Sequence, residues 1–371
     1  FFFTVVWLVG WVAGTGLLSA EHCPSPRRPS NIDEKLSAAR LAKRSFEQIG
    51  LARLRTDTPI DPRLDPTASG LIGIEQSDVT SNYGHLPAKR TSVNPNFAAV
   101  VVGWLQELGV RKGDTVALGV SGSFPALNIA VYAAIETLGI KPLIVASASA
   151  SAYGANLGDL TWLDMERELY AADLVSFRSL AATIGGDQDR GMRRPPVVRE
   201  TVIEAITRNN IVFLDPQSLG QSVKLRLDVI DAACGSCDLK AYINVGGGEA
   251  SLGSKPDRER IGAGITQRAS AGLTSQSVAR ALLERGIPLI HLGRVQELAL
   301  QYAFPVEPLG EVAVGEGLLY LETSHQRWIA GLAIICILLT LYAVTRLDVV
   351  QRIVASSRAA SEKDEKPGQM V

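Results

Sequence analysis

The stretch TVALGVSGSFPALNIAVYAAIETLGIKPLIVASAS, residues 115–149, decides the fold class. It opens with a short apolar run at 115–120, passes through a turn rich in Ser and Gly, and continues with helix-favouring residues as far as Leu138. Gly139 is typical of the residue that ends a helix, and a second apolar run follows it at 141–149. A strand, a helix and a strand in this order predict a β-α-β unit, in which two parallel strands are joined by a right-handed crossover.

A similar order recurs later in the chain. The run AYINV at 241–245 predicts a strand, the segment at 275–286 predicts a helix, and IPLIHL at 287–292 predicts a second strand. Other segments also show helical or strand-like patterns: helices at 31–55, 97–110, 197–208 and 222–233, and strands at 71–75 and 211–216. We therefore expect an α/β domain whose parallel or mostly parallel sheet is built from two β-α-β units.

Two long apolar segments flank this domain, one at each end. Residues 1–20 contain no charged side chain, and a second apolar run lies between Arg327 and Arg346. About 20 apolar residues match the hydrocarbon core of a bilayer, so both segments predict transmembrane helices. The small residues Ser19 and Ala20 leave a cleaved signal peptide as the alternative for the first segment.

The expected organisation has five parts: a transmembrane helix or signal anchor at 1–20, an amphipathic helix and linker at 21–70, an α/β soluble domain at 71–326, a transmembrane helix at 327–346, and a disordered basic and polar tail at 347–371. Basic residues gather at the start of the tail and within it: Arg346, Arg352, Arg358 and Lys363. Because positive charge favours the cytoplasmic side, we expect a cell-membrane protein with a cytoplasmic tail and an extracytoplasmic domain. Arg27 and Arg28, which follow the first segment, favour the opposite orientation.

The composition argues against several classes of protein. The formal net charge is −1, whereas a nucleic-acid-binding protein normally has a basic excess. The chain has neither a P-loop lysine motif nor G-x-G-x-x-G with its following acid, so we expect no nucleotide cofactor. Cys234 and Cys237 form C-G-S-C, but without a second such motif or a nearby His we expect no metal site. The residues before this motif favour a helix, whereas a redox motif follows a strand, so a structural disulfide or bystander thiols are the favoured interpretation.

The candidate ligand site lies at the turns that follow the first strand of each unit. The first turn offers the hydroxyls of Ser121 and Ser123, and Asn128 lies one helical turn further on. Its helix N-terminus has free N–H groups and a positive dipole end, which suit a carboxylate or phosphate. The second turn consists of Gly246, Gly247 and Gly248, which would allow close approach of a ligand. Because ligands bind at the carboxyl ends of parallel strands, we expect both turns to contribute, with tight capped turns as the alternative.

The first turn also suggests a nucleophile. Its sequence G-V-S-G-S resembles the nucleophile elbow G-x-S-x-G, but Ser123 replaces the last Gly. His291 ends a predicted strand and is the candidate base, so Ser123 and His291 form a candidate catalytic pair. A single His at a strand end is more often structural.

Two further groups of polar residues could carry chemistry. Lys89 and Arg90 stand beside Ser92, a combination that suits an anionic substrate or a solvated loop. Asp164 and Glu168 would share one face of a helix, as an acid–base pair or as an exposed helix start.

Four stretches together resemble the poly-γ-glutamate system protein family: AKRTSVNPNFAAVVV at 88–102, GSFPALNIAVYAAIE at 122–136, YGANLGDLTWLDMER at 153–167 and RGIPLIHL at 285–292. The matching positions are Lys89, Arg90, Thr91, Ser92, Asn94, Ser123, Pro125, Asn128, Trp162, Asp164 and Glu166. The resemblance implies a bacterial membrane component associated with making or exporting poly-γ-glutamate, and it implies no catalytic mechanism. Glu249 stands where the family resemblance implies an apolar residue, so the second turn fits it less well.

Three functions are compatible with these features. The first is a membrane-anchored accessory protein that binds poly-γ-glutamate or a partner synthase subunit. The second is an extracytoplasmic serine amidase or acyltransferase that acts on polyglutamate or on cell-wall amide bonds. The third is a membrane scaffold for a synthase complex. The sequence leaves open whether the chain is an enzyme and whether it forms a homo-oligomer.

Overall fold

The computed structural model describes residues 26–27, 31–191, 196–269 and 272–323, with a few single positions between 335 and 355. The chain divides into two compact units. One unit comprises Ser30–Tyr320, and the other combines Phe1–Pro29 with Leu321–Val371. In this second unit β1 (Pro26–Arg27) pairs antiparallel with β13 (Glu322–Thr323).

The unit Ser30–Tyr320 is built on a seven-stranded sheet in the order β11-β12-β10-β3-β4-β8-β9. Its strands are β3 (Thr115–Ser121), β4 (Lys141–Ser147), β8 (Ala181–Thr183), β9 (Val212–Phe213), β10 (Leu239–Val245), β11 (Gly264–Thr266) and β12 (Leu289–Leu292). Every neighbouring pair is parallel except β11 with β12. The predicted α/β class with a mostly parallel sheet is therefore confirmed, and both predicted strand pairs, β3–β4 and β10–β12, are parallel.

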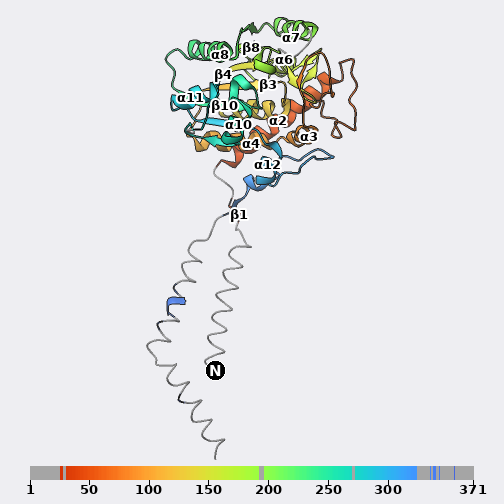
Figure 1. Ribbon diagram of the computed structural model, residues 1–371. Coiled ribbons are helices and arrows are strands. Elements are labelled where there is room, and N and C mark those ends of the chain that lie inside the picture. Colours follow the sequence, from red (N-terminus) through yellow and green to blue (C-terminus); the bar gives the residue numbers. More distant parts are fainter. Residues whose placement is uncertain are drawn as a thin grey trace, which may run out of the picture. The chain divides into compact units, whose positions relative to one another are not determined.

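Helices cover both faces of this sheet (Figure 1). They are α2 (Ile32–Arg53), α3 (Leu86–Ser92), α4 (Phe97–Glu107), α5 (Pro125–Leu138), α6 (Trp162–Ala171), α7 (Pro196–Arg208), α8 (Leu219–Cys234), α9 (Glu249–Leu252), α10 (Lys255–Ile261), α11 (Val278–Glu284) and α12 (Val295–Gln301). Successive residues of β3 point to opposite faces, so Leu118 joins the core formed with α2, α4 and α5, whereas Ala117 joins the core formed with α8, α9 and α11.

The first β-α-β unit has the local signals that the sequence suggests. Pro125 occupies the first turn of α5, where its missing N–H would have no helical partner in any case. Gly139 ends the helix in the left-handed conformation, with φ 64°. The chain then pairs β4 with β3 from Lys141 to Ser147 in an unbroken parallel register.

The strand predicted at 71–75 is not formed. Leu71 and Ile72 are buried as an apolar strand would be, but the backbone of this segment bonds to a loop and not to the sheet. Gly73 N–H donates to the Tyr153 carbonyl at 3.2 Å, and Ile74 N–H donates to Asn156 Oδ1 at 3.0 Å. A short apolar run cannot be assigned to a strand by its pattern alone. A buried loop can satisfy its backbone N–H and C=O groups through side-chain partners as well as a strand does through pairing.

Two small pairings outside the main sheet were not predicted. β2 (Thr80–Asn82) pairs parallel with β5 (Ala150–Ser151), and β6 (Asn156–Leu157) pairs antiparallel with β7 (Leu160–Thr161). The first of these pairings brings the segment after β4 against the segment before α3.

No helix in the described part of the chain has the length and apolar character needed to cross a bilayer. The predicted segment at 1–20, most of the predicted segment at 327–346 and nearly all of the tail at 347–371 lie outside the described residues. The helix expected within 21–70 is α2, which buries Ala38, Ala42, Phe46 and Ile49 in the core of the larger unit.

Candidate functional site

A cavity of about 390 Å³ opens at the carboxyl ends of the central strands. After β3 the chain forms β4, which pairs with one side of β3. Later in the sequence, β10 pairs with the other side of β3. This reversal between β3 and β10 is the point at which α/β sheets form a ligand crevice. We call the cavity the switch-point crevice. Its lining includes a group of serines, Ser81, Ser121, Ser123, Ser147, Ser149 and Ser151, and a group of charged residues, Asp187, Asp189, Glu249 and Arg258.

The two turns that the sequence singles out face each other in this crevice. Ser121, Ser123, Gly247 and Gly248 all line it. Gly246 has φ 85°, and a Cβ at that position would lie 3.4 Å from Ser121 Oγ. The structure therefore brings these predicted residues together, because both turns follow adjacent strands of one sheet edge.

Three other predicted residues do not line the crevice. The Asn128 side chain is buried and donates to the Ser121 carbonyl at 2.8 Å, which holds the turn from behind. Arg90 donates to the Leu64 carbonyl at 3.0 Å and pairs with Glu307 at 3.2 Å. Ser92 donates to a backbone carbonyl of its own helix at 2.6 Å. These contacts give Arg90 and Ser92 partners within the protein, and neither residue lines the crevice.

His291 is not close to the serine turn. It lies on β12, which β10 separates from β3, and neighbouring strands are about 4.8 Å apart. Its ring Nδ1 contacts the Asn244 amide nitrogen at 3.2 Å, and burial lowers the pKa of His291 to about 4. The Ser123–His291 pair is therefore not formed. Ser121 and Ser123 both lack the positive φ of a strained turn, so the resemblance to a nucleophile elbow is also not borne out.

Lys89 has the most unusual environment of the predicted residues. Its side chain is buried, with 2% exposure, although it belongs to the short helix α3. The ammonium nitrogen Nζ lies 2.7 Å from Ser151 Oγ, donates to the Ser123 carbonyl, and stands 3.9 Å from the centre of the Phe124 ring. Burial lowers the pKa of Lys89 to about 7. Ser123, Phe124 and Ser151 line the crevice, so Lys89 lies directly behind its wall.

Asp189, which lines the crevice, belongs to a buried ion pair that sequence reasoning missed. Arg226 and Asp189 are both buried and approach to 2.9 Å. Asp189 also accepts hydrogen bonds from Ser147 at 3.3 Å and Thr183 at 2.9 Å. The available signal was the position of Arg226, which shares the apolar face of α8 with Val223 and Ile230. A single basic residue at such a position needs a buried partner.

The crevice contains a polar group without a hydrogen-bond partner among the residues that the structure describes. This group is the Ser149 hydroxyl, which is buried and lines the crevice. Buried polar groups normally find partners, so this hydroxyl is available to a polar ligand.

The three carboxylates of the segment 162–170 serve the fold. Asp164 forms a capping box with Thr161 at the start of α6. Glu166 is buried and accepts from the Tyr132 hydroxyl at 2.6 Å, and burial raises its pKa. Glu168 pairs with Arg55 at 2.6 Å. The acid–base interpretation of Asp164 and Glu168 therefore has no support in their contacts, and neither residue lines the crevice.

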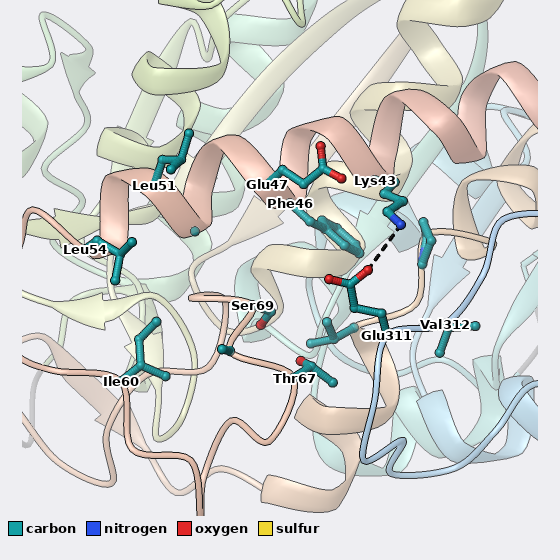
Figure 2. Close-up of a pocket in the computed structure, with 14 residues that line it drawn as sticks. Lys43, Phe46, Glu47, Leu51, Leu54, Ile60, Thr67, Ser69, Glu311 and Val312 are labelled. Atoms are coloured by element: carbon teal, nitrogen blue, oxygen red, sulfur yellow. Dashed lines mark hydrogen bonds and ion pairs between the residues drawn. The ribbon is translucent and has the colours of Figure 1, made fainter.

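A second cavity, of about 440 Å³, runs along α2 (Figure 2). Its lining is mainly apolar and includes Phe46, Leu51 and Leu54, with the ion pair Lys43–Glu311 of 3.2 Å at one side. None of the residues predicted to carry chemistry lines it.

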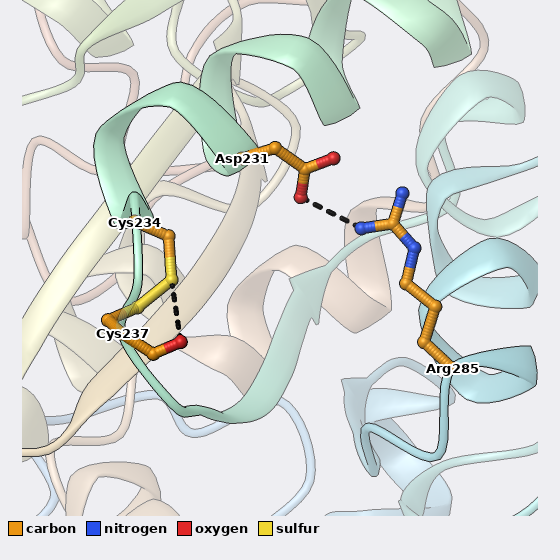
Figure 3. Close-up of a disulfide and its surroundings, with 4 residues drawn as sticks. All are labelled: Asp231, Cys234, Cys237 and Arg285. Atoms are coloured by element: carbon orange, nitrogen blue, oxygen red, sulfur yellow. Dashed lines mark hydrogen bonds and ion pairs between the residues drawn. A yellow bond between two sulfur atoms is a disulfide. The ribbon is translucent and has the colours of Figure 1, made fainter.

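Cys234 and Cys237 form a disulfide at the C-terminal end of α8 (Figure 3). A redox motif of this spacing belongs at a helix N-terminus, where the dipole stabilises a thiolate. The ion pair Asp231–Arg285, of 2.8 Å, lies nearby. The structural interpretation of the disulfide therefore fits its position. No cluster of metal-ligating side chains occurs among the residues described.

Comparisons with protein-family models, with curated protein sequences and with solved structures found no match for this chain.

Proposed function

We propose that this chain is a membrane-anchored accessory component of bacterial poly-γ-glutamate synthesis or export, and that its switch-point crevice binds the polymer or a chain end. The family resemblance of the four quoted stretches supports the polymer. The single observation that supports the crevice as the binding site is its position at the β3–β10 reversal, at the carboxyl ends of the central strands.

The charges of the crevice suit a chain that carries both carboxylates and an amine. The Arg258 guanidinium, which lines the crevice, can receive a carboxylate. Asp187 and Glu249 can accept from an ammonium group or from amide N–H groups. A γ-glutamyl chain end presents these three groups together, whereas a simple polyanion would meet repulsion from the acidic side chains.

The same proposal includes the placement of the protein. The apolar segments at 1–20 and 327–346 would hold the chain in the cell membrane, with the domain extracytoplasmic and the tail cytoplasmic. Synthase subunits are the partners that such an arrangement would bring close to the polymer.

Binding of γ-glutamyl oligomers, measured by titration calorimetry, tests the proposed ligand. We expect Arg258→Ala to weaken binding about tenfold, because a hydrogen bond to a charged group contributes about 1.5–3 kcal/mol. The wild-type affinity should also fall with added salt. Arg280→Ala is the matched control, since Arg280 pairs with Glu284 at the surface and lies outside the crevice. Equal losses in both variants, or no binding by the wild type, would contradict the proposal.

A further inference from the structure

We propose that Ser151 and Lys89 form a nucleophile–base pair, and that the switch-point crevice cleaves or transfers amide bonds through an acyl group on Ser151. The choice of a γ-glutamyl amide as the substrate rests on the proposed function above. The assignment of the nucleophile and the base does not, because it follows from the contacts of the two side chains.

The first argument is the geometry of the pair. Lys89 Nζ lies 2.7 Å from Ser151 Oγ, which is within hydrogen-bond distance for proton transfer. The same nitrogen donates to the Ser123 carbonyl and stands over the Phe124 ring at 3.9 Å, so the amine is held from three sides. Pairs of Ser and Lys act as nucleophile and base in several unrelated hydrolases.

The second argument is that Ser151 is rigidly placed. It belongs to β5, which pairs with β2, and the next residue, Ala152, donates to the Asn82 carbonyl at 2.8 Å. Its own N–H donates to Ser123 Oγ at 3.1 Å. A reacting group held by backbone pairing keeps its position better than one on a free loop.

Two glycines allow this arrangement. A Cβ at Gly154 would lie 2.5 Å from the Gly122 carbonyl oxygen, and a Cβ at Gly122 would lie 2.9 Å from the Ala150 Cβ. The segment that carries Ser151 therefore packs directly on the turn between β3 and α5. Any larger residue at these positions would move Ser151 away from the turn.

The third argument concerns the charge of Lys89. A buried lysine with a purely structural role normally pairs with a carboxylate. Lys89 forms no such ion pair with any residue that the structure describes. Its neighbours Ser123, Phe124 and Ser151 do not titrate near neutral pH.

The charged groups that line the crevice are Asp187, Asp189, Glu249 and Arg258. Burial of the Lys89 side chain is the cause that lowers its pKa. With a pKa of about 7, a large fraction of the amine is neutral at physiological pH and can accept a proton.

In the proposed reaction, Ser151 Oγ attacks the carbonyl carbon of the amide while its proton passes to the neutral Lys89 amine. The carbonyl electron pair moves to oxygen, which gives a tetrahedral oxyanion. The C–N bond then breaks, the Lys89 ammonium gives its proton to the leaving nitrogen, and an ester on Ser151 remains.

Water, or the amine of another chain, then attacks the ester and gives a proton to Lys89. Lys89 returns this proton to Ser151 Oγ as the ester bond breaks. The net change is hydrolysis of one amide to a carboxylic acid and an amine, or transfer of the acyl group to a new amine.

A fluorophosphonate probe tests the pair on the 371-residue chain, with the modified residue located by mass spectrometry. We expect one adduct, on Ser151, formed at a rate that rises as the pH passes through about 7. Ser151→Ala should abolish the adduct, and Lys89→Met should slow it about 100-fold or more, the usual contribution of a general base. The controls Ser176→Ala and Lys141→Met alter exposed residues outside the crevice and should label like the wild type.

The pH profile of the wild type requires no variant, so it remains decisive if a substitution prevents folding. Absence of an adduct, an adduct on another residue, or an unchanged rate in a folded Lys89→Met variant would overturn the inference. Labelling needs no polymer. Failure of labelling with intact oligomer binding would therefore refute only the catalytic pair, whereas labelling without oligomer binding would refute only the proposed ligand.

Discussion

Substitution of Lys89 by Met should change how the stability of the protein depends on pH. The pKa of Lys89 falls from 10.5 to about 7 because the side chain is buried. In the unfolded chain the amine keeps its ordinary pKa, so between these two values the unfolded state binds a proton that the folded state has released. The contribution of Lys89 to the free energy of unfolding must therefore rise as the pH rises from about 7 toward 10.5.

The size of this effect follows from the shift. A difference of about 3.5 pKa units corresponds to about 5 kcal/mol over the whole range, at 1.36 kcal/mol per unit. Between pH 7 and pH 9 the linkage relation gives about 2 kcal/mol, since the folded amine is half protonated at the lower pH. Below about pH 6 both states carry the proton, and the pH dependence from this group disappears.

Urea unfolding at pH 7, 8 and 9 measures this contribution as the difference between the wild type and Lys89→Met. Taking this difference removes the contribution of all other titrating groups to the pH dependence. Lys141→Met, which alters an exposed lysine, controls for the loss of a charge. We expect wild-type stability to gain about 2 kcal/mol relative to Lys89→Met across this interval. A difference that stays constant within about 0.5 kcal/mol, at equal m-values, would show that Lys89 is not a buried amine of lowered pKa.

Three further predictions concern the stability of the fold. Arg226→Met should lower the free energy of unfolding by about 3–5 kcal/mol in urea titrations, because it leaves a buried carboxylate without its partner. Gly154→Ala should lower it by about 1–3 kcal/mol through overpacking, whereas Gly103→Ala, in the helix α4 and with room for a Cβ, should raise it by about 0.5–1 kcal/mol. Replacing both Cys234 and Cys237 by Ser should cost about 2 kcal/mol or less and leave oligomer binding unchanged in calorimetry, since the disulfide closes a short loop.

The sequence predicted the features that depend on local pattern. The runs at 115–120 and 141–149, with a helix between them that ends at Gly139, contain the signals of a β-α-β unit, and the structure has each element. The turns at Ser121 and at Gly246 could be placed at one sheet edge, because parallel strands present their carboxyl ends together. The position of the crevice could therefore be predicted from the sequence, whereas the side chains that form its walls could not.

The sequence could not predict the features that depend on which segments meet in space. Lys89 looks like a surface residue because Arg90, Thr91 and Ser92 follow it, yet its side chain is buried against Ser123, Phe124 and Ser151. The order of the strands places β10 between β3 and β12, and this alone separates His291 from the serine turn. Neither the burial of Lys89 nor the separation of His291 from the serine turn can be inferred from the periodicity of the sequence, because both result from long-range packing.

The contacts of the crevice serines decide which of them can act as a nucleophile. Ser123 Oγ accepts from the Ser151 N–H at 3.1 Å, so it positions Ser151, and no basic side chain among the described residues bonds to this hydroxyl. The hydroxyl of Ser147 contacts the buried Asp189 at 3.3 Å and belongs to the ion-pair network. The Ser149 hydroxyl has no hydrogen-bond partner in the part of the chain that the structure describes. Ser151 contacts an amine that burial has brought close to neutrality, and its hydroxyl therefore has a group to which its proton can pass.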